Sequence, residues 1–183
     1  MNIDELQEAG VDVFDISENE LFPFSKTWKK TFEAIEKSLK ELNNEPEKER
    51  ILQKVSNIVN VLVRFGTTYE DIVLEIAELY VFSREANIDP KFFEKAYGKG
   101  VVESVVCLNN ALDTDEKRKA VFENEKHRYL GKIKIADYLV EIADNPKISK
   151  EYKLEIDEVI KHYKERSHKA LMRMLIAERK RIK

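Results

Sequence analysis

The chain has 183 residues, 43% hydrophobic and 37% charged content, and a formal net charge of −3 at pH 7, which together suit one domain with its own core. Its one cysteine, Cys107, excludes an internal disulfide, and no apolar run reaches the roughly 20 residues that a bilayer requires. The acidic start does not resemble a signal peptide, so we expect a cytoplasmic protein without a membrane span.

Residues 1–24 form an acidic lead-in with some apolar residues. Its carboxylates all precede the first basic residue; they are Asp4, Glu5, Glu8, Asp12, Asp15, Glu18 and Glu20. Pro23 ends the segment, and Ser25 is a suitable N-cap for the first helix. We therefore expect the lead-in to pack loosely against a single helical domain of residues 25–183.

Three helices are predicted in the first half of the chain. Apolar residues at three- and four-residue spacing predict the first, which ends before Asn43; they are Trp28, Phe32, Ile35, Leu39 and Leu42. The second spans the apolar residues from Ile51 to Val63, and Gly66 is expected to close it in a left-handed conformation. Residues 68–71 resemble a capping box at the start of a third, largely apolar helix that continues through Val81.

Shorter helices and a charged surface segment follow. Asp89 and Pro90 predict the start of a short helix that stops at Gly98. An apolar helix is then expected from about Val101 to Leu112. The charged residues 113–131 predict a surface segment ending at Gly131, with one helical stretch from about Lys117 to His127.

Two helices are predicted at the end of the chain. A buried helix covers Ile133 to Ala143, and Ser149 caps a long final helix that reaches Ile182. The basic residues that close this helix complement the helix dipole, although contact with phosphates is also open. Because no segment alternates as a strand does, we predict an all-α fold.

Residues 54–66, 76–85, 96–102 and 134–139, taken in this order, resemble the HD phosphohydrolases of the alarmone (guanosine tetraphosphate) hydrolase type. In that family a helix of the form H-P-x-x-V-A-x-x-L-x-x-x-G is followed by A-A-x-L-H-D-x-x-E-D, F-G-x-x-V and K-L-A-D-x-L-x-N. The resemblance covers about residues 30–165 and implies an HD-domain-like helical bundle.

The resemblance also implies that most metal ligands are lost. HD enzymes use two separate histidines and two aspartates to hold a divalent metal that activates a water molecule. By the resemblance, Lys54 stands at the position of the first histidine, and residues 80–81 stand at the positions of the His-Asp pair. Only the last metal ligand is kept, as Asp137. The Glu-Asp pair that assists the water corresponds to Arg84 and Glu85. Asp137 and Glu85 are therefore vestigial catalytic candidates, and we expect no metal.

A metal-free relative of these enzymes is expected to bind a phosphorylated purine nucleotide without hydrolysing it. By the resemblance, Lys54, Lys134 and Arg84 are candidate phosphate contacts, and Tyr80 is a candidate wall of the pocket. An ion pair between Lys54 and Asp137 is one hypothesis for what replaces the metal. In the competing interpretation Lys54 faces solvent, Tyr80 is a core aromatic and Asp137 pairs with Lys134 on its own helix.

Two other functions stay open at the level of the sequence. One is a helical protein-interaction module with a vestigial pocket, which meets a partner through the acidic N-terminus or the basic C-terminal helix. The other is an active phosphohydrolase with an unrecognised ligand set, for which manganese is the expected cofactor. Nucleic acid is not an expected partner. The acidic residues Asp71, Glu75 and Glu78 share one helix face, which we interpret as solvated rather than as a metal site.

Overall fold

The computed structural model describes residues 27–40, 44–67, 71–110, 112–145, 147–165 and 168–182, with side chains from residue 30 onward. Within these ranges the chain forms nine α-helices and one 3₁₀ turn, with no strand. They are α3 (Thr27–Leu39), α4 (Glu45–Arg64), α5 (Asp71–Glu85), η1 (Pro90–Phe93), α6 (Glu94–Tyr97), α7 (Lys99–Asn109), α8 (Asp115–Phe122), α9 (Tyr129–Asp144), α10 (Lys150–Tyr163) and α11 (Lys169–Arg181). The predicted all-α fold is confirmed.

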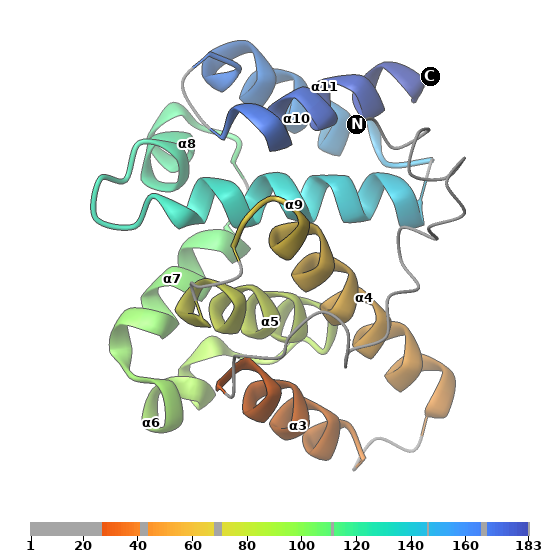
Figure 1. Cartoon of the computed structure of the whole chain (residues 1–183), viewed down its shortest axis with the longest axis vertical. Helices are drawn as coiled ribbons and strands as arrows, with labels where there is room; N and C mark the ends of the chain where they lie inside the picture. The colour runs from red at the N-terminus through yellow and green to blue at the C-terminus, as the bar shows by residue number, and fades with distance from the viewer. Residues whose placement is uncertain are drawn as a thin grey trace.

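Helix α5 lies at the centre of the lower part of the molecule, where it packs against α3, α4 and α7 (Figure 1). Helix α9 runs across the upper side of this group, contacts α4, and is covered in turn by α11. Both helices are buried on nearly every side, along residues 73–83 of α5 and 133–140 of α9. A helix that is apolar around most of its circumference belongs in the interior, so the composition of α5 and α9 explains their central positions.

Local signals fix the ends of α4. The side chain of Asn44 accepts a hydrogen bond from the backbone N–H of Glu47, which caps the start of the helix. At the other end Gly66 has a φ of +88°, and Thr67 N–H donates to the carbonyl of Leu62 at 3.2 Å. This is the hydrogen bond of a Schellman motif, which requires the left-handed residue predicted at Gly66.

In the middle of the chain the predicted helices are present, but their ends differ from the predicted ones. Asp89 caps the start of η1, and the short helix stops at Gly98, but its first turn is 3₁₀ rather than α. Helix α8 begins and ends a few residues before the expected stretch. Helix α9 begins at Tyr129, so Gly131 lies inside the helix and does not end the surface segment. The apolar packing of α9 outweighs the weak helix preference of glycine there.

The prediction of one long final helix is wrong. Helix α10 ends at Tyr163 and α11 begins at Lys169, after His168 with a φ of +41°. The break lets α11 turn back beside α10 (Figure 1), so that Leu171 and Leu175 are buried against the body of the domain. A straight helix would carry these leucines away from the core and into water.

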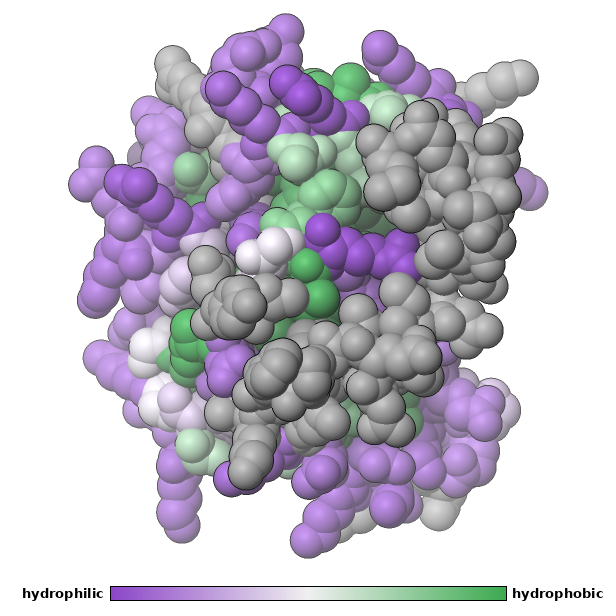
Figure 2. Space-filling model, in the orientation of Figure 1, coloured by the Kyte–Doolittle hydropathy of each residue, from purple (hydrophilic) through white to green (hydrophobic). Residues whose placement is uncertain are grey.

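Several sequence expectations lie outside the described residues. They are the acidic lead-in of residues 1–24, the cap at Ser25 and the capping residues 68–70. Among the described helices, none is both long and apolar enough to span a bilayer. Hydrophilic side chains cover most of the described surface in Figure 2, and apolar ones appear there as small patches. The largest exposed apolar side chains include Phe92 and Leu154.

Two leucines give a direct test of the core. Leu74 in α5 is 0% exposed and Leu154 in α10 is 55% exposed. Leu74→Ala should lower the free energy of unfolding by about 2–5 kcal/mol, because it leaves a cavity in a packed interior. Leu154→Ala should change it by less than about 0.5 kcal/mol. Urea unfolding measures both values, and equal losses in the two variants would contradict the described packing.

Candidate functional site

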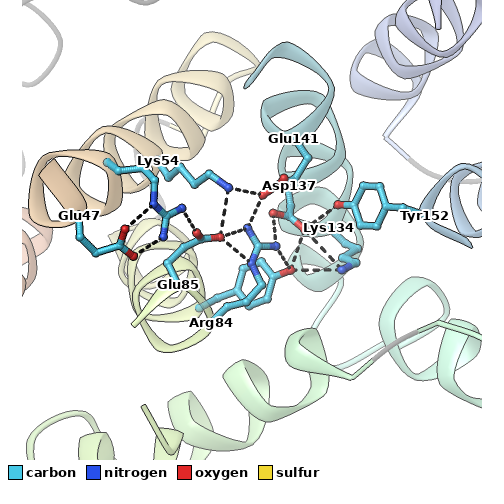
Figure 3. Close-up of polar contacts among 10 residues, drawn as sticks. Glu47, Lys54, Arg84, Glu85, Lys134, Asp137, Glu141 and Tyr152 are labelled. Carbon is cyan, nitrogen blue, oxygen red and sulfur yellow. Dashed lines mark hydrogen bonds and ion pairs between the residues drawn. The ribbon is translucent and has the colours of Figure 1, made fainter. Parts of the chain in front are cut away.

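Charged and phenolic side chains from four helices meet between α4, α5, α9 and α10 (Figure 3). We call them the polar cluster: Glu47, Arg50, Lys54, Tyr80, Arg84, Glu85, Lys134, Asp137, Glu141 and Tyr152. On α4 and α9 they recur at three- or four-residue spacing, for example Lys134, Asp137 and Glu141 on α9. That spacing places them on one face of the helix. The cluster therefore forms where polar faces of otherwise apolar helices meet.

The inner layer of the polar cluster is buried around Asp137, which is 1% exposed. The hydroxyl of Tyr80 donates to Asp137 Oδ2 at 2.7 Å, and Tyr152 reaches the same oxygen at 3.4 Å. Lys134 Nζ lies 3.4 Å from Asp137 Oδ2 and 3.7 Å from Glu155 Oε1. The ammonium group also lies 5.6 Å from the centre of the Tyr80 ring, close enough for a cation–π contact. Each buried charge in this layer thus has a charged partner.

The outer layer is half-buried and is organised by Arg84. Its guanidinium lies 2.6 Å from Asp137 Oδ1, 2.8 Å from Glu141 Oε1 and 3.1 Å from Glu85 Oε1. Lys54 Nζ lies 2.9 Å from Glu141 and 3.3 Å from Glu85. Arg50 also pairs with Glu85. The side chains of Arg84, Glu141 and Lys54 keep 28%, 19% and 15% of their exposure, so solvent reaches this layer but not the one behind it.

The pKa shifts show that the charges of the cluster are stabilised in place. Burial alone would raise the pKa of Asp137, but the charges of Arg84 and Lys134 outweigh it and hold that pKa below its usual range. Burial also opposes ionisation of Glu85, yet Arg50 and Arg84 lower the pKa of that carboxyl as well. Burial and the nearby Asp137 raise the pKa of Tyr80 to about 12. At neutral pH the carboxylates are ionised and Tyr80 stays a neutral hydrogen-bond donor.

The surroundings of Asp137 do not suit a divalent cation. The described residues include no group of three or more histidine, cysteine, aspartate or glutamate side chains placed to hold a metal ion. The guanidinium of Arg84 already forms ion pairs with the carboxylates of Asp137 and Glu141. A divalent ion beside Asp137 would have to displace Arg84 and would be repelled by Lys134 as well.

The structure brings together all the candidate residues that the sequence singled out, although some of their partners differ. The hypothesis of a Lys54–Asp137 ion pair is wrong, because Lys54 pairs with Glu85 and Glu141 while Arg84 and Lys134 pair with Asp137. The competing interpretation of Lys54 as solvent-facing is also wrong. The expected local pair of Asp137 with Lys134 is confirmed.

Other residues were missed or misplaced. Arg50 lies four residues before Lys54, and that spacing was the available signal that both share a helix face. Tyr152 carries no comparable signal, because it reaches Asp137 only through the packing of α10. The solvated face expected at Glu75 and Glu78 is wrong, since both side chains are buried, and Glu75 accepts a hydrogen bond from Thr31 at 3.3 Å.

Comparisons of the chain with protein-family models, with curated proteins and with solved structures found no match.

Replacing Asp137 with asparagine tests the inner layer. Asp137→Asn keeps the shape of the side chain but leaves buried Lys134 and half-buried Arg84 without one charged partner. The free energy of unfolding at pH 7 should fall by about 3 kcal/mol. Asp113→Asn is the matched control, because Asp113, just before α8, also pairs with a lysine a few residues away, Lys117, but at the surface. That variant should differ little from the natural chain.

The effect of Asp137→Asn should also depend on pH. The folded pKa of Asp137 lies below the unfolded value of about 3.9, so its carboxylate stabilises the fold fully above that pH and loses this contribution as the pH falls through the folded pKa. The difference in stability between the natural chain and Asp137→Asn should therefore shrink below about pH 4. Urea unfolding across this range measures it, and a constant difference would show that the charge of Asp137 is not what stabilises the cluster.

Proposed function

We propose that this chain is a non-hydrolytic relative of the HD phosphohydrolases that binds a phosphorylated purine nucleotide, without a metal, at the outer layer of the polar cluster. The observation that supports the proposal is the convergence of Arg50, Lys54 and Arg84 on the single carboxylate of Glu85. These three cations meet at a site that solvent reaches, and they offer the charge-assisted donors that a phosphate group requires, in exchange for the carboxylates that they pair with.

Binding would proceed by exchange of one anion for another. A terminal phosphate group carries about −1.5 to −2 charges and three acceptor oxygens, against one charge and two oxygens for the carboxylate of Glu85 or Glu141. A phosphate that replaces one of these carboxylates would therefore make stronger charge-assisted hydrogen bonds with Lys54 and Arg84. The displaced carboxylates stay attached nearby and compete for the same cations, so we expect nucleoside di- and triphosphates to bind better than monophosphates.

The two layers give the candidate residues different roles. Lys54 and Arg84 stay phosphate contacts, and Arg50 joins them because it shares Glu85. Lys134 and Tyr80 are 5% and 0% exposed and lie behind Arg84, so in this proposal they position Asp137 rather than touch the ligand. That the phosphate belongs to a purine nucleotide rests on the sequence resemblance alone.

The electrostatics of the cluster favour binding over hydrolysis. A water molecule that attacks phosphorus needs a metal or a general base beside it. The two vestigial catalytic candidates, Asp137 and Glu85, have lowered pKa values and are engaged by arginine and lysine side chains. Lowered pKa values make both carboxylates weak bases, and the engaged oxygens do not face an incoming water.

The basic end of the chain gives the protein-interaction alternative less support than the sequence suggested. Arg179 pairs with Asp157 of α10 at 2.7 Å, and Arg181 pairs with Glu178 at 2.9 Å. These arginines are partly neutralised within the domain, which weakens their attraction for an acidic partner.

Thermal unfolding with guanine and adenine nucleotides tests the proposal, with Lys54→Gln as the variant. Nucleoside di- or triphosphates should raise the unfolding midpoint of the natural chain in the presence of a chelator, through mass action. Lys54→Gln should weaken the binding about tenfold, because one charged contact is lost. Lys48→Gln is the matched control: Lys48 lies on the same helix at a similar exposure and pairs with Glu45. Its nucleotide affinity should be unchanged.

Replacing a carboxylate of the polar cluster should have the opposite effect on nucleotide binding in the same experiment. Glu141→Gln removes a competing charge from both Lys54 and Arg84, so it should strengthen nucleotide binding even though it lowers the stability of the free protein. A midpoint shift that requires manganese, with release of phosphate, would favour the active phosphohydrolase. If no nucleotide changes the midpoint of any variant, the protein-interaction module becomes the better account.

A further inference from the structure

A separate surface pocket, open to solvent and about 520 Å³ in volume, lies at the opposite end of α5 from the polar cluster. Its walls come from the start of α5, the segment before α9 and the first turn of α9, and include Ile72, Val73, Lys126, Arg128, Tyr129 and Lys132. The nearest members of the two sites on α5 are Val73 of this pocket and Tyr80 of the polar cluster, which at 1.5 Å per residue lie about 10 Å apart along the helix. The volume falls within the range of small-molecule sites.

The walls of the pocket combine cations with apolar surface. The lining holds three cations and two carboxylates, so positive charge predominates. They are Lys126, Arg128, Lys132, Asp71 and Glu125. Ile72 is 46% exposed, which is unusual for an isoleucine at the start of a central helix. Together with the ring of Tyr129 it adds apolar surface to the lining. A ligand that fits these walls has an anionic group at one end and a flat apolar body.

The aromatic wall is held in place by hydrogen bonds. The hydroxyl of Tyr129 lies 2.8 Å from Nδ1 of His127 and 3.3 Å from Oγ of Ser104. On the other side, Nε2 of His168 donates to the backbone carbonyl of Arg128 at 3.1 Å. These three contacts fix the segment that carries the cations before any ligand arrives, and such preorganisation reduces the entropy lost on binding.

The helix termini at the pocket add to its preference for anions. Helices α9 and α11 begin beside it, after Arg128 and His168, and neither start has a hydrogen bond from a capping side chain among the described residues. Backbone N–H groups and the positive end of the helix dipole at such starts favour a negative group.

We propose that this pocket is a second binding site, for a small aromatic phosphate, and that it is independent of the polar cluster. The phosphate lies against Lys126 and Arg128, and the ring lies against Tyr129 and Ile72. Since the two sites share no side chain, either proposal can fail without the other.

Titration of the full chain with phenyl phosphate, followed by NMR, tests this site. The signals of Ile72, Val73 and Tyr129 should shift and saturate, whether or not phenyl phosphate also moves those of Lys54 and Arg84 in the polar cluster. Inorganic phosphate and phenol, each carrying half of the ligand, should bind at least about tenfold more weakly. The affinity for phenyl phosphate should fall as salt is added, because the cations are largely exposed.

Arg128→Ala tests whether the cations of this pocket bind the phosphate. It should weaken phenyl phosphate binding about tenfold, and it keeps the backbone carbonyl that His168 needs. Lys95→Ala, which removes an exposed cation from α6, is the control and should bind as the natural chain does. Unchanged affinity in Arg128→Ala, shifts confined to the polar cluster, or no saturable shift at Ile72 and Tyr129 would each overturn the proposal.

Discussion

The contact on which the rest of the domain depends joins Arg84 of α5 to Asp137 of α9. Asp137 is almost fully buried, and an ionised carboxylate in that position is costly unless cations and hydrogen-bond donors surround it. Arg84, Lys134 and Tyr80 meet that requirement only when α5 and α9 lie in one relative position. The apolar faces of these helices supply most of the stabilising free energy, and the ion pairs restrict how the faces pack.

The same contacts determine what chemistry the centre of the domain performs. A metal-dependent phosphohydrolase leaves its carboxylates open to a cation and to an activated water. Here Arg84 pairs with Asp137, Glu141 and Glu85 at once, so these carboxylates are engaged in ion pairs between helices. What stays accessible is the outer row of cations, whose charges a phosphate group matches better than the carboxylates do. The proposal of binding without hydrolysis rests on this division between a buried inner layer and a half-buried outer one.

Local patterns in the sequence predicted the helices well, and predicted the partners of charged residues poorly. Gly66 and Asp89 act within a few residues of themselves, so their roles as helix stop and helix cap could be inferred without the fold. The choice between Lys54 and Arg84 as the partner of Asp137 depends on how far α4 and α5 each lie from α9, which no periodicity encodes. The break before α11 and the burial of Glu75 depend in the same way on neighbours that are distant in sequence.

A crystal structure of the protein grown with manganese would test the central claim most directly, namely that a guanidinium group holds the position beside Asp137. The account predicts that Arg84 remains on Asp137 and Glu141, with no anomalous scattering from manganese between α5 and α9. A manganese ion bound by Asp137 and Glu85, with Arg84 turned away from both, would contradict it.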